Sequence, residues 1–296
     1  MKTNDIIIKS YEHISEDTKF IRLVTITNFV HSLVFVFVLI YNLYMLLDHF
    51  DSSINIDVAK YISQILLTPN IIPIFVVVGI LLLVGQLLLP PIGEAACVYY
   101  LDDPEHKGKD SLSKWLPKFF QLFEYDGMFY FFTYFTFAVF VSRLFILDII
   151  YEPIVMALVI VWWILVLCVN ICIPYARYII ILEDKSIADG ISEAVTMTIK
   201  NSVLSIKLAL ITLILNLRFI INILFVVGIP LACIYIVVYF DFDKNIFVKY
   251  GIYTIVWLLT LLLAYINWII ESYFMCMWYE AYKYNRSKDD ITSSIT

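Results

Sequence analysis

Four ionisable residues lie within apolar stretches of the chain, where a charge is costly unless it is paired or hydrated. They are Glu94, Arg177, Arg218 and Glu271. Counted from the external end of the membrane span predicted around it, each lies about 22 to 24 residues deep, which at about 1.5 Å per residue is roughly 33–36 Å from that surface. We therefore predict a single layer of two acids and two bases at the cytoplasmic edge of the hydrocarbon.

Two kinds of chemistry suit this layer, and the sequence leaves both open. Acids and bases at one depth can neutralise each other, since the planar fork of an arginine fits a carboxylate, and the layer is then an ion-pair network that fixes helix packing. In that network Arg218 is predicted to pair with Glu271 first and with Glu94 second. Alternatively, the layer lines a polar cavity open to the cytoplasm or the inner leaflet. Arg177 and Arg218 would then bind an anionic headgroup or a small charged solute.

The rest of the sequence offers little for the chemistry of soluble enzymes. It contains no Walker loop, dinucleotide fingerprint, HExxH, GxSxG or paired-cysteine zinc pattern. The five cysteines all lie in apolar stretches, where we expect packing residues: Cys97, Cys168, Cys172, Cys233 and Cys276. Cys168 and Cys172 share a helix face, but no nearby histidine or acid completes a metal site. We therefore expect no catalytic residue, no metal site and no cofactor, and hence a protein that is not an enzyme.

The composition predicts that the elements carrying these residues are helices in lipid. Hydrophobic residues make up 62% of the chain and charged residues 16%, and the mean hydropathy is +0.88. A helix needs about 20 apolar residues to cross a hydrocarbon layer about 30 Å thick. Six stretches meet this requirement: Thr25–Leu47, Ile71–Tyr100, Gly127–Leu147, Pro153–Leu182, Val203–Phe240 and Phe247–Tyr282. We predict an all-α polytopic membrane protein with six transmembrane helices.

The distribution of basic residues predicts the orientation of these spans. Most of the 20 Lys and Arg lie in the N-terminal segment, near residues 108–118 and 177–207, or in the C-terminal tail. Four lie on the opposite side: Lys60, Arg143, Lys244 and Lys249. Because cytoplasmic loops carry the excess of positive charge, both termini are predicted to be cytoplasmic. The expected location is the cytoplasmic (cell) membrane.

A short amphipathic helix followed by a transmembrane hairpin recurs three times along the chain. This pattern predicts one transmembrane domain, residues 1–296, with threefold pseudo-repetition. The repeat units cover approximately residues 5–101, 111–184 and 186–286. The ends of the second and fourth predicted spans also match, with Ala95 opposite Ala176 and Asp103 opposite Asp184.

The three amphipathic helices are predicted on the cytoplasmic side. Their predicted apolar faces are Ile7, Tyr11 and Ile14 in the first, Leu112, Trp115, Leu116, Phe119, Phe120 and Phe123 in the second, and Ile187, Ile191, Ala194, Val195 and Ile199 in the third. Lys118 and Gln121 are predicted on the opposite face of the second helix, and Ser186 and Asp189 form a capping box that begins the third. Such helices lie either in the headgroup layer or against the cytoplasmic extensions of the spans, and the sequence does not separate the two.

The chain resembles a broad group of six-span integral membrane proteins that includes the glycerophosphoryl diester phosphodiesterase membrane-domain family. The resemblance is carried by residues 174–195, a span end followed by a capped amphipathic helix, and by Glu271–Arg286 with Tyr279, Tyr282 and Tyr284. It implies a shared architecture. Some members of that family carry a separate phosphodiesterase domain, for which this chain has no room outside its predicted spans.

Two functions are compatible with these observations. The first is a non-enzymatic integral membrane protein that acts as a scaffold or accessory subunit. The alternative is a transporter or lipid-handling protein with a polar site at the inner leaflet, which the ionisable layer and the prolines within the spans would serve. The expected partners are membrane lipids and other membrane proteins, and no nucleic acid.

Overall fold

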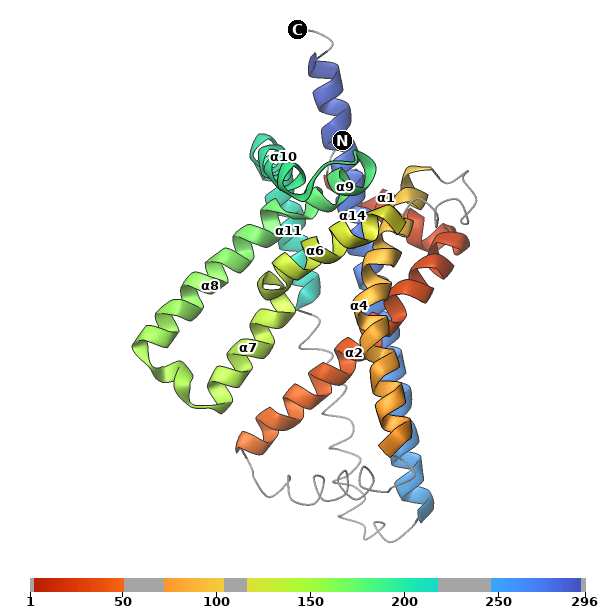
Figure 1. Cartoon of the computed structure of the whole chain (residues 1–296), viewed down its shortest axis with the longest axis vertical. Helices are drawn as coiled ribbons and strands as arrows, with labels where there is room; N and C mark the ends of the chain where they lie inside the picture. The colour runs from red at the N-terminus through yellow and green to blue at the C-terminus, as the bar shows by residue number, and fades with distance from the viewer. Residues whose placement is uncertain (1–2, 51–71, 104–115, 218–245, 294–296) are drawn as a thin grey trace. The chain divides into compact units, whose positions relative to one another are not determined.

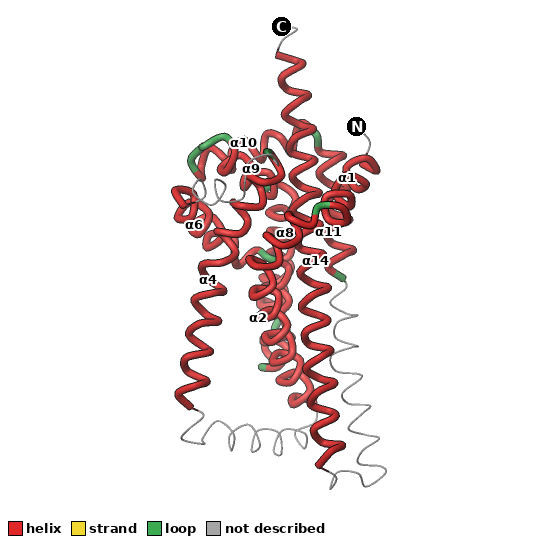
Figure 2. The backbone as a smooth tube through the Cα atoms, turned by 90° about the vertical axis from the view of Figure 1, so that its right-hand side faces the viewer, coloured by secondary structure: helices red, strands yellow, loops and turns green. Residues whose placement is uncertain are grey.

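Long helices account for nearly all of the chain that can be described. The structure, a computed structural model, describes residues 3–50, 72–103, 116–217 and 246–293. These residues form α-helices, short 3-10 helices and turns, and none of them is in a strand (Figure 2). The predicted all-α class is therefore confirmed for this part of the chain.

Only some of the six predicted spans coincide with described helices that are long and apolar enough to cross a membrane. Within the described residues, two helical stretches meet this test, Pro153–Leu182 and Leu258–Lys288, and two bent helix pairs would raise the number to four. The remaining long helices are α2 (Thr18–Phe50) and α4 (Ile72–Asp102). The predicted span Val203–Phe240 runs beyond the described residues after Leu217. The number six thus stays a prediction.

The chain divides into two compact units. Unit 1 comprises Met1–Asn28, Leu87–Ile214 and Ile269–Thr296, and unit 2 comprises Phe29–Gln86 and Leu215–Trp268. In unit 2, the buried side chains of Val36, Leu263 and Ala264 form a small apolar core, against which Phe29, Leu33 and Phe35 pack. All the polar clusters described below belong to unit 1.

A helical hairpin is the largest continuous part of unit 1. It consists of η1 (Leu116–Lys118), α6 (Phe119–Phe129), η2 (Tyr130–Phe132), α7 (Tyr134–Ile146), η3 (Ile149–Tyr151), α8 (Pro153–Cys172) and α9 (Pro174–Leu182). Pro153 and Pro174 each begin a helix, because proline lacks the N–H that a first turn leaves unpaired. Phe137 of α7 packs on Trp162 and Trp163 of α8, with ring centroids 5.1 and 4.8 Å apart.

Two helices that meet at a sharp bend follow the hairpin. α10 (Ile187–Lys200) begins at Ser186, whose hydroxyl accepts a hydrogen bond from the Asp189 N–H at 3.2 Å, which confirms the predicted N-cap. α11 (Ser202–Asn216) leaves α10 at an angle of 103°. Gly190 brings α10 close to α9, because a Cβ at that position would lie 2.7 Å from Cγ1 of Ile180.

The first helix, α1 (Thr3–Glu16), buries a different face from the predicted one. Ile6 and Ser10 are fully buried, whereas Tyr11, which the sequence placed on the apolar face, is exposed. The Ser10 hydroxyl donates to the Ile6 carbonyl at 2.7 Å, so this small polar residue needs no outside partner when buried. The prediction failed because the hydroxyl satisfies itself locally, which a hydrophobicity pattern does not register.

Three tyrosines link α4, α9 and α14 (Ile246–Ser293) in a cycle. Tyr99 of α4 donates its hydroxyl hydrogen to the carbonyl of Ile181 in α9 at 2.9 Å. Tyr178 of α9 donates to Met275 of α14 at 2.8 Å, and Tyr279 of α14 donates to Leu101 of α4 at 3.1 Å. These are the second helices of the three predicted hairpins. The cyclic order is the one that a threefold repeat would produce, although the repeat itself remains a prediction.

Candidate functional site

The centre of the candidate site is the guanidinium of Arg177 in α9. Its Nη1 donates to Oε1 of Glu94 in α4 at 2.7 Å, and its Nη2 donates to Oδ1 of Asp126 in α6 at 2.9 Å. The ring of Tyr125 lies against the same guanidinium, with the centroid 5.5 Å from Cζ. These four residues, which we call the Arg177 cluster, join three helices through one side chain.

Local structure explains how the members of the cluster meet. Pro174 restarts the helix after Cys172, and the hydroxyl of Tyr125 donates to the carbonyl of Ile173 at this break, at 3.0 Å. α6 is thereby fixed against the start of α9, one turn from Arg177. Asp126 follows Tyr125 directly and so comes within reach of the guanidinium.

The charge balance of the cluster limits its chemistry. Two carboxylates face one guanidinium, and each occupies a different terminal nitrogen of the arginine fork. The side chain of Arg177 is 39% exposed, while that of Glu94 is 11% exposed. The arrangement cross-links helices through charge-assisted hydrogen bonds. An incoming anion would meet two carboxylates that are already bound to the guanidinium.

The structure brings together two of the four residues predicted from the sequence. Glu94 and Arg177 form an ion pair, as their common depth suggested. Glu271 lies on α14, close enough to Glu94 to interact with it electrostatically. Arg218 lies outside the described residues, and so does its predicted pairing with Glu271.

Asp126 is the member of the cluster that sequence reasoning missed. It lies at the start of the predicted third span, about 21 residues before the external end at Leu147, so the same depth count applies to it. Asp126 was not among the four predicted residues because it lies one residue before the predicted boundary of the third span at Gly127. In the structure α6 continues through that boundary to Phe129.

A second cluster of charges ties α9, α10 and α14 together. Oε1 of Glu183 accepts hydrogen bonds from the Tyr282 hydroxyl at 2.7 Å and from Nε of Arg286 at 2.6 Å. Nη2 of Arg286 also pairs with Glu193 at 2.6 Å, and Lys185 pairs with both glutamates. We call these five residues the Glu183 cluster. It lies at the end of α9, next to Asp184.

The hydrogen bonds of this cluster shift the pKa of two of its members. Burial alone would raise the pKa of Glu183, but the hydrogen bonds from Arg286, Lys185 and Tyr282 outweigh it and lower the pKa from its ordinary value of 4.5. The hydrogen bonds to Glu183 and Glu193 raise the pKa of Lys185 above its ordinary value. Both shifts favour the charged forms, so Glu183 and Lys185 are ionised at neutral pH.

A third ion pair joins the start of α6 to the end of α9. The side chain of Lys118 is only 7% exposed and pairs with Asp184, which follows α9 in a left-handed conformation with φ of 57°. Nζ of Lys118 also donates to Gln121 at 3.2 Å. The sequence placed these polar residues opposite the apolar face, and the structure confirms that separation for Phe120. It shows, however, that the polar face points inward and Phe120 outward.

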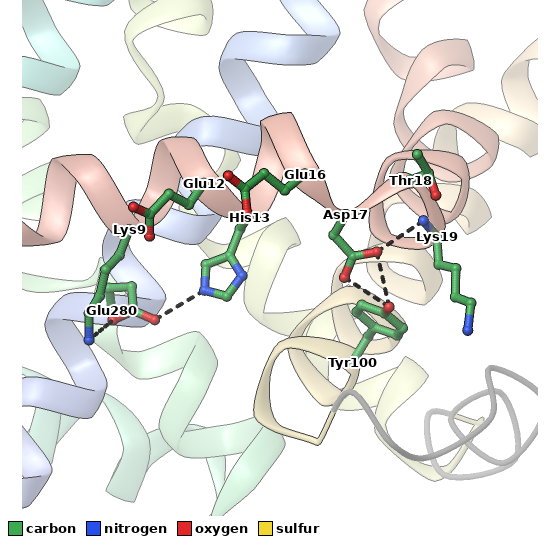
Figure 3. Close-up of a pocket in the computed structure, with 9 residues that line it drawn as sticks. All are labelled: Lys9, Glu12, His13, Glu16, Asp17, Thr18, Lys19, Tyr100 and Glu280. Carbon is green, nitrogen blue, oxygen red and sulfur yellow. Dashed lines mark hydrogen bonds and ion pairs between the residues drawn. The ribbon is translucent and has the colours of Figure 1, made fainter.

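A shallow cavity of about 640 Å³ lies where α1 meets α2 (Figure 3). Its lining residues are Lys9, Glu12, His13, Glu16, Asp17, Thr18, Lys19, Tyr100 and Glu280. Glu280 faces Nε2 of His13 at 3.3 Å and Nζ of Lys9 at 3.9 Å. Asp17 accepts the Tyr100 hydroxyl at 2.9 Å and caps α2 through the Phe20 N–H at 3.0 Å. The carboxylates of Asp17 and Glu280 thus both have partners from the chain itself.

No metal centre emerges from the described residues, among which no three histidine, cysteine or acidic side chains are grouped to hold an ion. Cys97 and Cys276 are buried as packing residues, whereas Cys168 is exposed, and Cys233 lies outside the described part. Comparison of the chain with protein-family models, with curated proteins and with solved structures finds no match in any of the three.

Proposed function

We propose that the protein is a non-enzymatic integral membrane protein that acts as a scaffold or accessory subunit. The observation that carries the proposal is the closure of the Arg177 cluster, in which each terminal nitrogen of the arginine meets a carboxylate from another helix. Such a cluster fixes the positions of three helices, and a ligand would have to share the guanidinium with two carboxylates from the chain itself. The Glu183 cluster does the same for α9, α10 and α14.

The packing around the Arg177 cluster supports the same function. Helices α4, α9 and α14 meet through side chains that are fully buried, among them Ala95, Cys97, Ala176, Ile179 and Met277. A transport path at this level would need polar groups open to water. The described helices instead meet through tyrosine hydroxyls bonded to carbonyls of the neighbouring helix.

The proposed protein has six transmembrane spans in the cell membrane. Six spans with both termini in the cytoplasm place α1, α6 and α10 on one side of the cell membrane, each before a hairpin. The resemblance to the phosphodiesterase membrane-domain family is proposed for architecture alone. The partners in this function are membrane lipids and other membrane proteins.

A transporter or lipid-handling protein is the second candidate, and one observation favours it. Arg177 keeps 39% of its side chain exposed, and the cluster carries one more carboxylate than guanidinium. A cation or proton that entered from the cytoplasm would meet this excess negative charge.

Reconstitution distinguishes the two candidates. Proteoliposomes containing the wild-type protein are tested for flipping of a fluorescent phospholipid and for release of small charged dyes, with empty vesicles as the blank. The scaffold function predicts no flux above the blank, together with cross-linking of the protein in native membranes into a complex larger than the monomer. Flux that is lost in Arg177→Gln, while the variant keeps its thermal stability, would establish the second candidate instead.

A further inference from the structure

Helix α6 buries one apolar face and exposes another. Leu122 and Tyr125 are buried, and Lys118 and Asp126 reach ion-pair partners on that side. On the outer side Phe120 is 76% exposed, and Phe123, Glu124 and Met128 are exposed as well. Soluble proteins rarely expose large contiguous apolar faces, because each buried apolar Å² contributes about 25 cal/mol. The outer face of α6 therefore fits an apolar neighbour.

The bend between α10 and α11, which we call the elbow, presents a second apolar face. Ile199 at the end of α10 is 70% exposed, Val203 at the start of α11 is 68% exposed, and Ile206 is also exposed. Lys207 lies in the same exposed stripe of α11 as Val203 and Leu210. A lysine within an apolar stripe is typical of a helix at a membrane surface, where its stem lies in lipid and its ammonium reaches the phosphates.

The length of the α7–α8 hairpin fixes the depth of both apolar faces in the membrane. α8 has 20 residues, and at about 1.5 Å per residue it is about 30 Å long, the thickness of the hydrocarbon layer. Both helices bond to its far end: Tyr125 of α6 donates to the Ile173 carbonyl at 3.0 Å, and Thr198 of α10 donates to the Cys172 carbonyl at 3.4 Å. Figure 1 shows α6 and α10 at the end of the hairpin away from the α7–α8 turn. They therefore lie one hydrocarbon thickness from that turn.

We propose that these two faces form a collar surface that lies in the phospholipid headgroup layer, on the membrane side opposite the α7–α8 turn. The collar surface consists of Phe120, Phe123 and Met128 of α6 and Ile199, Val203 and Ile206 of the elbow. Its occupant is phospholipid, and Lys207 binds the phosphate of an anionic headgroup. The sequence left open whether the amphipathic helices lie in the headgroup layer or against the spans. In this proposal each helix does both, because one of its faces docks on the bundle and another contacts lipid. This inference holds for a scaffold and for a transporter alike.

Spin labels measure the depth directly. Single cysteines are introduced at Phe120, Val203, Val161 in the middle of α8, and Ser287 near the end of α14, in a background without native cysteines. The labelled protein is placed in nanodiscs of phosphatidylcholine and phosphatidylglycerol. Relaxation by oxygen and by a water-soluble nickel chelate should place labels 120 and 203 at the level of the phosphates, label 161 deep in the hydrocarbon and label 287 in water. The proposal would be overturned if labels 120 and 203 were as accessible to the nickel chelate as label 287. It would also be overturned if protein shielded these two labels from both reagents.

A second measurement needs no cysteine replacement. Benzoylphenylalanine at position 120 of the otherwise unaltered chain should cross-link phospholipid on illumination, and cross-linking to another polypeptide instead would contradict a lipid occupant. For the anionic headgroup, phosphatidylglycerol should raise the melting temperature of the wild type more than phosphatidylcholine does. That difference should disappear in Lys207→Gln and persist in Lys283→Gln, which removes an exposed lysine of α14 outside the collar surface. An equal difference in both variants would remove Lys207 from the proposal.

Discussion

The hydroxyl of Tyr279 donates to the carbonyl oxygen of Leu101 at 3.1 Å and thereby closes the cycle that joins α14 to α4. Leu101 lies in the last turn of α4, where carbonyls have no partner within the helix. Ile181, which accepts from Tyr99, lies at the corresponding place in α9. Tyr279 and Tyr99 thus complete helix ends, where an unpaired carbonyl in an apolar setting would be costly, whereas Tyr178 donates to Met275 inside α14.

Replacing Tyr279 by phenylalanine should destabilise the protein by about 1 kcal/mol, because the Leu101 carbonyl loses its hydroxyl donor while the ring and its packing remain. Thermal unfolding in detergent measures the change. Tyr99→Phe should cause a loss of similar size, because the Ile181 carbonyl also lies in the last turn of its helix. The loss in Tyr178→Phe should be smaller, since Met275 lies inside α14, where an intrahelical N–H is available to its carbonyl. Tyr130→Phe is the control, because Tyr130 is 57% exposed in the same unit. A loss in the control equal to those in Tyr279→Phe and Tyr99→Phe would show that the cycle has no special role.

The Arg177 cluster should respond to mutation as a unit. Arg177→Met leaves Glu94 and Asp126 without their cation, so we expect a loss of roughly 1.5–3 kcal/mol, the range for hydrogen bonds to charged groups. Adding Glu94→Gln and Asp126→Asn removes the stranded charges and should restore much of that stability. Thermal unfolding of the single, double and triple variants measures the coupling. Strictly additive losses would mean that the three side chains act independently.

Depth along the predicted spans placed Glu94 and Arg177 in one layer, where an arginine and a glutamate in an apolar setting must find each other or water. It did not identify them as partners, since the pairing predicted for Glu94 was with Arg218, whereas the structure pairs it with Arg177. The same count, applied to Asp126, would have found the third member. What it does not provide is azimuth, the direction in which a side chain points around its helix. Glu94, Asp126 and Arg177 come from three helices whose rotations depend on packing that no single sequence segment contains.

The amphipathic helices show a second limit of prediction from sequence: the pattern shows which side chains share a face but not which face is buried. The sequence separates Lys118 from Phe120 on α6 correctly, since a period of 3.6 residues fixes which side chains share a face. The period does not fix which apolar side chains are buried: in α6, Leu122 and Tyr125 are buried, whereas Phe120 is exposed. For α10 the N-cap at Ser186 is local and was predicted, whereas the close approach at Gly190 depends on Ile180 of another helix and was not.

Acid should weaken the Glu183 cluster as the carboxylate of Glu183 becomes protonated. The pKa of Glu183 in the folded protein is lower than its ordinary value of 4.5, so its contribution is present above pH 4.5 and is lost as the pH falls toward the folded pKa. The pKa of Lys185 is raised, so its contribution is lost only at strongly alkaline pH. We expect the melting temperature to fall as the pH is lowered below 4.5, and this fall to be shallower in Glu183→Gln. Glu124→Gln, an exposed carboxylate of α6, is the control and should follow the wild-type profile.

Gly190 offers the sharpest test of how α10 docks on α9. In Gly190→Ala the new Cβ would lie 2.7 Å from Cγ1 and 3.3 Å from Cδ1 of Ile180, so the helices must separate or Ile180 must shift. Overpacking of this kind costs about 1–3 kcal/mol, which exceeds the gain of about 1 kcal/mol that alanine brings over glycine in a helix. The net result should be a lower melting temperature in detergent.

Two further variants make this prediction decisive. Ile180→Ala removes both atoms that the new Cβ would meet, so the double variant Gly190→Ala with Ile180→Ala should be less destabilised than the two single losses added together. Gly127→Ala in α6 is the matched control, since nothing lies within 4 Å of a Cβ built there, and it should raise the melting temperature through helix propensity alone. If Gly190→Ala were as stabilising as Gly127→Ala, the close approach of α10 to α9 would be ruled out, and with it the position of the elbow from which Lys207 is proposed to reach the lipid phosphates.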